Sequence, residues 1–449
     1  MKNTRNVSWI VIMFFALYCI LPDYLALELS PALPLLTASR IALLCLVLWA
    51  LTRRGPSGLA LTGDKPLRFG LLGFFALMTA ANIPHFGASL GDTLKGIGVA
   101  LEGYLVVWGI TRMLDSRRAV LSALWTLVLA SGAVGVIAAV GCAVGENPFH
   151  VLRTVERNAL MSEYIRLGLL RAAAGFGHPV YYGAFCAVML PLCMYFVYTK
   201  TGHCRILAMG CAAMNVTGLV LSNSRGSILA AICVGVVILV LSFRQPKLLL
   251  TRWLPVLAMA LVVLILVVTV AGAGITFLSD VTVSVAQSVI EPELAPGTSE
   301  PEQLSGEYGE NINGVSSRMA QLTGILWTLE RGPVFGLGYN AHMRGLVSYQ
   351  WEPGRWQATP TFDMAPVAII CQYGFVGLAG YCLLYGTALW CMFRSRRDPL
   401  MRCLLTMALT FGLCMLSVSG MDALQWVLLG VLTSLVNVTR EQKVEAYGV

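Results

Sequence analysis

The sequence predicts an all-α integral membrane protein with about twelve transmembrane helices. Three observations carry this prediction: the composition, the recurrence of long apolar runs, and the side on which basic residues gather. Of the 449 residues, 57% are hydrophobic and 12% are charged, and the mean hydropathy is +0.74. This composition excludes a soluble globular protein, because repeated runs of roughly 18–25 apolar residues are typical of membrane spans.

Long apolar runs recur along the whole chain, so residues 1–449 are expected to form a single polytopic membrane domain. The expected spans are 7–27, 33–51, 68–84, 94–111, 119–144, 178–199, 205–222, 226–243, 253–278, 364–393, 400–419 and 421–438. Lys2 and Arg5 precede the first run, and no convincing cleavage site follows it. This run is therefore interpreted as an uncleaved span rather than a signal peptide.

The basic residues predict the orientation of these spans. Most of the 31 Lys and Arg residues fall in short loops on one side of the arrangement, together with both termini. Because short cytoplasmic loops carry an excess of Lys and Arg, both termini are expected in the cytoplasm. Topology thus explains most of the net charge of +8. The chain has no nucleic-acid-binding motif, so membrane lipids and not nucleic acids are expected partners.

Two long segments are predicted to lie on the opposite, extracytoplasmic side. The first is 145–177, in which residues 155–174 are expected to form an interfacial helix. The second is 279–363, a large loop between the ninth and tenth spans that is expected to cover the functional site. Within this loop, Ser316 and Ser317 can cap the start of a helix, and the Gly-Pro pair that begins at Gly332 ends it.

Basic residues on the outer side are mostly arginine, which suits phosphate and carboxylate better than lysine does. Arg318 lies in the first turn of the loop helix, beside free amides that favour an anion. Arg225 lies in the turn S-N-S-R-G between two spans. Each arginine has a simpler alternative: Arg318 as a solvated surface residue, and Arg225 as a contact to lipid phosphate.

Three further charges lie in or at the ends of spans. Arg40 and Glu102 are each about two turns inside a span, at similar depth. Charges in a membrane are costly and usually pair inside the bundle, so one interpretation is a structural Arg40–Glu102 pair. The other is that Arg40 faces a polar cavity and binds an anion. Lys95 begins its span on the outer side, where it can extend to lipid headgroups.

Histidine and cysteine patterns give little sign of a metal. The 13 Cys residues fall within or beside apolar spans, with no C-x-x-C spacing, and are interpreted as small packing residues. His178 opens a span in G-F-G-H-P, and His342 follows the Gly-rich turn G-L-G-Y-N-A. No His, Cys, Asp and Glu grouping has strong metal-ligand spacing, so neither a metal nor another cofactor is expected.

Four motifs follow one another on the predicted outer face. They are GFGHPVYYGAFCAVMLPL, SNSRG, an SSR that begins a helix ending in GPVFGLG, and TFDMAPVAIICQYGFVGLAGY. Their order resembles the O-antigen ligase/polymerase superfamily, the Wzy-like and WaaL-like membrane glycosyltransferases. The resemblance covers about residues 170–385.

The resemblance implies a GT-C-like bundle in the bacterial cytoplasmic (inner) membrane. It also implies a metal-independent glycosyltransferase that moves a glycan from an undecaprenyl-pyrophosphate carrier to an acceptor hydroxyl at the outer face. The acceptor is a glycan or a lipid-linked glycan, and polysaccharide-assembly proteins are possible partners. By match to the family motifs, Arg225 and Arg318 would bind the pyrophosphate, with Arg40 as a third candidate.

One departure from the family pattern bears on the reaction. Ligases of the family carry His, usually His-Asn, before the last Gly-x-x-Gly span, where this sequence has Asp363 and Met364. The departure favours a polymerase of O-antigen, capsule or exopolysaccharide over a ligase. Asp363 is the preferred catalytic base by position, and His342 is the alternative because its ordinary pKa of ~6.5 suits neutral pH.

The remaining expectations concern substrate contacts and competing functions. His178, Lys95, Tyr339 and Asn340 are expected to bind substrate. A polysaccharide or lipid flippase is a competing function of a different class, but the chain has no internal repeat of the kind that transporters show. A non-catalytic membrane scaffold is a third alternative, which does not explain the excess of outer arginines.

Overall fold

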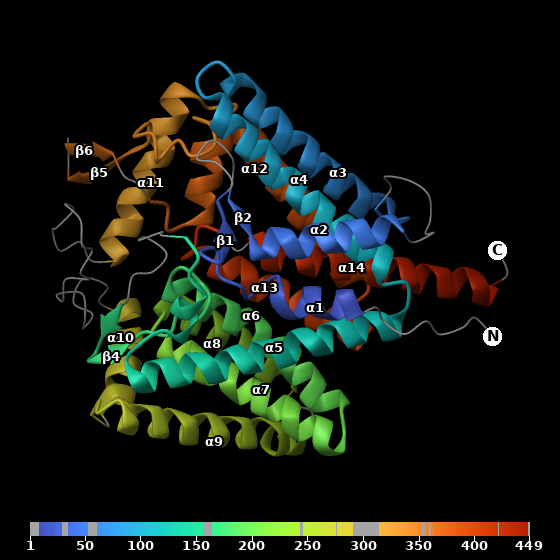
Figure 1. Cartoon of the computed structure of the whole chain (residues 1–449), viewed down its shortest axis with the longest axis vertical. Coiled ribbons are helices and arrows are strands. Elements are labelled where there is room, and N and C mark those ends of the chain that lie inside the picture. The colour runs from blue at the N-terminus through green and yellow to red at the C-terminus, as the bar shows by residue number, and fades with distance from the viewer. Residues whose placement is uncertain are drawn as a thin grey trace.

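The computed structural model describes residues 9–28, 35–52, 61–155, 164–242, 246–274, 276–290, 314–352, 355–358, 361–420 and 422–447. This part of the chain is a bundle of α-helices with three short antiparallel hairpins, β1–β2, β3–β4 and β5–β6. The all-α membrane fold class is therefore confirmed. Figure 1 shows the long helices packed side by side, with α9 along one edge of the bundle.

The helices within these ranges follow the apolar runs of the sequence. They are α1 (Trp9–Leu17), α2 (Ala38–Leu51), α3 (Lys65–Asn82), α4 (Leu90–Met113), α5 (Arg117–Val144), α6 (Pro179–Thr199), α7 (Gly202–Leu221), α8 (Arg225–Ser242), α9 (Pro246–Val270), α10 (Thr276–Ile290), α11 (Gly314–Arg331), α12 (Ala365–Arg394), α13 (Pro399–Cys414) and α14 (Asp422–Tyr447). Two 3-10 turns, Ile83–His85 and Pro148–Leu152, join some of them. The strands are β1 (Ala26–Leu27), β2 (Leu36–Thr37), β3 (Ile165–Arg166), β4 (Leu169–Leu170), β5 (Ser348–Glu352) and β6 (Arg355–Ala358).

Short polar residues define where several helices begin. Asp64 caps α3, Ser89 caps α4 and Ser116 caps α5, each by accepting a hydrogen bond from a backbone N–H in the first turn. Such caps satisfy amides that have no partner within the helix.

Eight helices in the described ranges are long and apolar enough to cross a membrane. The helices α2, α8, α10 and α13 contribute shorter apolar segments. Each of the twelve predicted spans contains helix, but the structure does not confirm the count of twelve.

Three local predictions differ from the structure. In the predicted span 7–27 the helix α1 ends at Leu17, and Ala26 and Leu27 form strand β1. The helix expected over 155–174 is absent from its described part, where β3 and β4 form a hairpin. Leu167 (φ 55°) and Gly168 (φ 73°) form its turn in the left-handed region, which a right-handed helix cannot contain. Residues 156–163 of this prediction lie outside the described ranges. The predicted span 253–278 is also too long: α9 ends at Val270, and α10 begins at Thr276 as a separate helix.

The helix α11 ends where the sequence predicts, but it begins at Gly314, so Ser316 and Ser317 lie within the helix and do not cap it, and Arg318 is its fifth residue. Its last residue is Arg331, directly before the Gly-Pro pair. In Figure 1, α11 and the β5–β6 hairpin lie at the upper left, whereas the C-terminal end of α14 lies at the far right. The described parts of the two predicted outer segments therefore lie away from the C-terminal end of α14. The membrane side of each end stays a prediction.

A large hydrophobic core runs through the bundle, and a second, smaller core lies under α11. The smaller core joins Ala341, Val347 and Tyr349 to Val367 and Cys371 of α12, all of them buried. The first three belong to the described part of the predicted loop 279–363, which we call the loop segment. Burying these side chains together fastens the loop segment to the membrane bundle.

The loop segment is also joined to α12 through the backbone. Gly374 interrupts α12 with φ 60° and ψ −154°, a conformation that is essentially restricted to glycine. In an unbroken helix, the N–H groups of Phe375 and Val376 would bond the carbonyls of Cys371 and Gln372. The break leaves all four of these groups without their helical partners.

The turn that follows α11 supplies the missing partners. The carbonyls of Cys371 and Gln372 accept hydrogen bonds from the N–H groups of Leu337 (2.9 Å) and Gly338 (3.0 Å). The N–H groups of Phe375 and Val376 donate to the carbonyls of Pro333 (2.9 Å) and Val334 (3.0 Å). The motifs G-P-V-F-G-L-G and Q-Y-G-F-V-G are thus two halves of one joint.

Replacement of Gly374 by Ala is expected to break this joint. A Cβ there would lie 2.4 Å from the Gly336 nitrogen, and the backbone conformation alone would cost about 1–3 kcal/mol. We expect a lower melting temperature of the detergent-solubilised protein and loss of activity. Gly386→Ala is the matched control, because a Cβ at Gly386 of the same helix meets nothing within 4 Å. Equal melting temperatures for the two variants would contradict the joint.

Candidate functional site

A buried arginine marks the first part of the site. Arg171 follows the β3–β4 hairpin and is 5% exposed. Its Nε donates a hydrogen bond to the carbonyl of Ser222 (3.0 Å), and the N–H of Ala172 donates to the carbonyl of Leu221 (3.0 Å). These two bonds hold Arg171 against the turn that leads into α8, where Arg225 is the first residue.

The turn before α8 contains a second buried polar group. Asn223 is 1% exposed and adopts the left-handed conformation (φ 47°) that asparagine tolerates. Neither its amide nitrogen nor its amide oxygen has a hydrogen-bond partner within the described part of the chain. Because a buried polar group without a partner is costly, Asn223 is well suited to receive one from a ligand.

His178 lies where the charges of Arg171 and of Arg318, from the loop segment, both act. It caps α6, and its Nδ1 accepts a hydrogen bond from the N–H of Val180 (3.1 Å). Burial, together with the positive charges of Arg171 and Arg318, lowers the pKa of His178 to about 3. The imidazole is therefore neutral at neutral pH, and its capping bond gives it a structural role. Binding of substrate by His178 stays a prediction.

Arg318 reaches the same region from α11. Burial lowers its pKa, and attraction to the carboxylate of Asp363 opposes that effect. Asp363 is in turn held by Gln321 of α11 through two hydrogen bonds. The Gln321 Nε2 donates to the Asp363 carboxylate (2.7 Å), and the N–H of Asp363 donates to Gln321 Oε1 (2.9 Å). Asp363 therefore ties the entry of α12 to the helix that carries Arg318.

His342 lies close to the segment that contains Asp363. Its ring is 4.5 Å from the ring of Phe362, the residue before Asp363. Burial lowers the pKa of His342 to about 4, so its imidazole is neutral at neutral pH. Its buried Nδ1 has no hydrogen-bond partner in the described ranges.

A cavity of about 270 Å³ opens next to His342. Its walls come from α3, α4, α12 and α14 and from the segments that follow α11 and α13. The lining residues are Phe74, Met78, Gly96, Val99, Ala100, Tyr339, Asn340, His342, Phe362, Ala368, Ile369, Gln372, Tyr373, Tyr381, Ser419, Gly420 and Trp426. Three residues predicted to be functional, Tyr339, Asn340 and His342, are among them.

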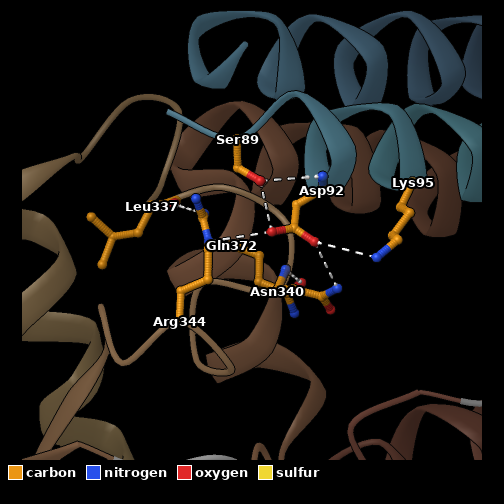
Figure 2. A network of polar contacts seen from close by, with 7 residues as sticks. All are labelled: Ser89, Asp92, Lys95, Leu337, Asn340, Arg344 and Gln372. Atoms are coloured by element: carbon orange, nitrogen blue, oxygen red, sulfur yellow. Dashed lines mark hydrogen bonds and ion pairs between the residues drawn. The ribbon is translucent and has the colours of Figure 1, made fainter. Parts of the chain in front are cut away.

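A polar network centred on Asp92 holds one wall of this cavity (Figure 2). The Asp92 carboxylate accepts hydrogen bonds from Ser89 (2.9 Å) and from the amide nitrogen of Asn340 (3.3 Å). It also pairs with Lys95 (3.8 Å) and Arg344 (3.6 Å). In this structure Lys95 therefore contacts a protein carboxylate, and its predicted contact with substrate is not tested.

The predicted Arg40–Glu102 ion pair is present. Arg40 Nε lies 3.3 Å from Glu102 Oε2, and an Arg40 terminal nitrogen donates to the carbonyl of Leu35 (2.7 Å). Tyr18 also contacts the Glu102 carboxylate (3.5 Å). These bonds favour the structural interpretation of Arg40, and pyrophosphate binding by Arg40 stays a prediction.

Sequence reasoning gave no role to three residues that the fold places in the site. Arg171 was one of several outer arginines, and Asn223 was only part of a turn motif. Gln321 had no distinguishing signal at all. The sequence shows Asn223 between the two serines of S-N-S-R-G, but it does not show that Asn223 is buried.

The Arg40–Glu102 pair gives a direct test of stability. Arg40→Ala leaves Glu102 with an unmatched charge, so we expect a loss of roughly 1–3 kcal/mol, less than the cost for a fully buried pair. The double variant Arg40→Ala, Glu102→Gln should recover most of this loss in thermal unfolding. A single variant that unfolds like the wild type but is inactive would instead place Arg40 among the substrate contacts.

One known family matches part of the chain. Residues 210–382 match the model of the O-antigen ligase family. The match includes Arg225, Arg318, His342 and Asp363, and it spans both halves of the joint between the loop segment and α12. No curated protein sequence matches the chain. The match over residues 210–382 supports the resemblance of this part of the chain to the O-antigen ligase/polymerase superfamily of membrane glycosyltransferases.

Proposed function

We propose that the protein transfers a glycan from an undecaprenyl-pyrophosphate carrier to an acceptor hydroxyl at the outer face of the inner membrane. We further propose that it does so as a polysaccharide polymerase. The family match over residues 210–382 supports glycosyl transfer of the O-antigen ligase or polymerase type. Asp363, in the place of the family's ligase histidine, supports a polymerase, and ligation to another acceptor remains the alternative.

The observation that carries this proposal is the convergence of arginines at one place. Arg171 and Arg318 both act on the buried His178, although they come from segments far apart in the chain. Arg225 begins α8, next to the turn that Arg171 holds. We call Arg171, Arg225 and Arg318 the arginine cluster. Arginines gathered in a partly desolvated site fit a pyrophosphate, which carries several charges and many acceptor oxygens.

The arginine cluster supports the departure of the leaving group. As the bond between the sugar C1 and the pyrophosphate oxygen breaks, negative charge grows on the pyrophosphate. Fixed guanidinium groups stabilise that charge more strongly in a site of low polarity than in water. The amide of Asn223 can donate a further hydrogen bond to a phosphate oxygen.

His342 is placed to act as the catalytic base. It lines the cavity, its imidazole is neutral, and Nδ1 lacks a partner in the described ranges. The acceptor oxygen forms its bond to C1 while Nδ1 takes the hydroxyl proton, and undecaprenyl pyrophosphate leaves. Asp363 is instead engaged by Gln321 and attracts Arg318. The geometry thus supports His342 over Asp363, the residue preferred from sequence position.

Lysine substitutions test the arginine cluster. In Arg225→Lys and Arg318→Lys the charge is kept but the forked hydrogen-bond geometry is lost, so we expect transfer to fall roughly 10- to 100-fold. Transfer would be measured with purified protein and a synthetic undecaprenyl-pyrophosphate glycan. Arg153→Lys is the control, because Arg153 is exposed in a predicted outer segment. Normal transfer rates in both test variants would contradict pyrophosphate binding and would leave these arginines with roles in topology or lipid binding only.

A second pair of variants identifies the base. His342→Gln should lower kcat by roughly 10²–10⁴-fold without changing donor binding, as expected for loss of a general base. Asp363→Asn should mainly weaken donor binding, because it removes the negative charge that attracts Arg318. If Asp363→Asn binds donor normally yet transfers nothing, Asp363 is the base.

The pH dependence of the wild-type rate follows from the buried imidazole. Its pKa is lowered, so the neutral, proton-accepting form persists as the pH falls and is lost only through about pH 4. The acid limb of kcat/KM, which reports groups of the free enzyme, should therefore lie near 4. A limb near the ordinary histidine value of ~6.5 would contradict a buried His342 base.

A further inference from the structure

The cavity beside His342 differs in character from the arginine cluster. None of the described residues that line it carries a charge. We call it the neutral cavity. Its volume of about 270 Å³ corresponds to roughly nine water molecules, which is the scale of a sugar ring rather than of a polymer.

The lining of the neutral cavity combines flat aromatic faces with neutral hydrogen-bonding groups. Tyr381 and Trp426 offer rings, while Asn340 and Gln372 offer amides. A pyrophosphate needs cations that this cavity lacks, and a polyprenyl tail needs a uniformly apolar wall. A polyol fits both halves of the lining, because its C–H faces pack on rings and its hydroxyls bond amides.

The neutral cavity is linked at two points to residues that lie beside the arginine cluster. Ser419 lines the cavity, and its hydroxyl bonds the hydroxyl of Tyr181 (2.6 Å), three residues after His178. Phe362 also lines the cavity and directly precedes Asp363. A hydroxyl held in the cavity beside His342 would therefore lie close to the sugar of a donor whose pyrophosphate occupies the arginine cluster.

The wall that carries Asn340 and His342 is fixed before any ligand binds. Asn340 adopts the left-handed conformation (φ 56°), its N–H donates to Gln372 Oε1 (3.2 Å), and its side chain bonds Asp92. Arg344 donates to the carbonyl of Leu337 (2.9 Å) and pairs with Asp92, as Figure 2 shows. A wall fixed in this way lowers the entropic cost of binding a flexible sugar.

We propose that the neutral cavity is the acceptor subsite and binds the terminal sugar of the acceptor glycan as an uncharged polyol. This assignment rests on the proposed function, since it names the second substrate of the same reaction. It places selectivity for the acceptor in α3, α4, α12 and α14, apart from the arginines that hold the donor.

The test separates acceptor binding from donor binding. The acceptor probe is the oligosaccharide released by mild acid from the lipid-linked glycan of the cells that make the protein, and NMR would report its affinity. The donor probe is undecaprenyl pyrophosphate without glycan, followed by native mass spectrometry. Val99→Phe fills the cavity from α4, and Ile369→Phe fills it from α12. Leu101→Phe is the control, because Leu101 is 55% exposed on the same helix as Val99.

Both filling variants should weaken oligosaccharide binding at least tenfold, leave undecaprenyl pyrophosphate binding unchanged, and keep the wild-type melting temperature. If one of the two variants does not fold, the other still fills the cavity, from a different helix, and provides the test. Unchanged oligosaccharide affinity in a folded variant would overturn the subsite. Loss of undecaprenyl pyrophosphate binding instead would make the cavity a lipid pocket and also overturn it. A third outcome separates the two proposals. If the variants block oligosaccharide binding but the wild-type protein transfers no glycan, the subsite stands and only the proposed function is refuted.

Discussion

The exchange of four backbone hydrogen bonds between α12 and the turn after α11 is the constraint on which the site depends. A helix broken at Gly374 exposes two carbonyls and two N–H groups, and such groups must find partners away from water. Residues 333–338 provide all four. The same joint sets the path of the chain to Tyr339, Asn340 and His342. It also fixes α11, and with it Arg318, against the entry of α12.

The joint brings two environments of different character together. On one side, Arg171 and Arg318 act on His178, which burial keeps neutral, and Arg225 begins α8 beside the turn that Arg171 contacts. On the other side, the neutral cavity offers rings, amides and a second neutral histidine. The division matches the two substrates of the proposed reaction, a pyrophosphate that leaves and a sugar hydroxyl that attacks.

The sequence predicts most of the bundle because membrane helices are specified locally. Apolar runs of sufficient length must be helical in a bilayer, and helix ends follow local signals such as the Gly-Pro pair at Gly332. The same local signals located Arg225 and Arg318. The sequence does not predict the hairpin at Leu167, because its apolar residues are equally compatible with an interfacial helix. Only the left-handed turn at Gly168 decides between them, and a single glycine is a weak signal.

Long-range contacts account for what the sequence did not predict. The burial of Arg171 depends on Ser222, 51 residues away. The two hydrogen bonds between Gln321 and Asp363 join residues 42 positions apart, and they support the proposal that Asp363 has a positioning role, while its role as the base stays a prediction. The Arg40–Glu102 pair was among the predicted alternatives because equal depth in two spans is visible in a sequence. No comparable rule links a glutamine in a loop helix to an aspartate before a span.

Product stoichiometry tests the central claim most directly. Purified protein would receive a synthetic undecaprenyl-pyrophosphate glycan as donor and a glycan acceptor, and both products would be counted over one time course. The account predicts one undecaprenyl pyrophosphate released for each glycosidic bond added to the acceptor. Release of undecaprenyl pyrophosphate without growth of the glycan, or no release at all from a folded protein, would contradict it.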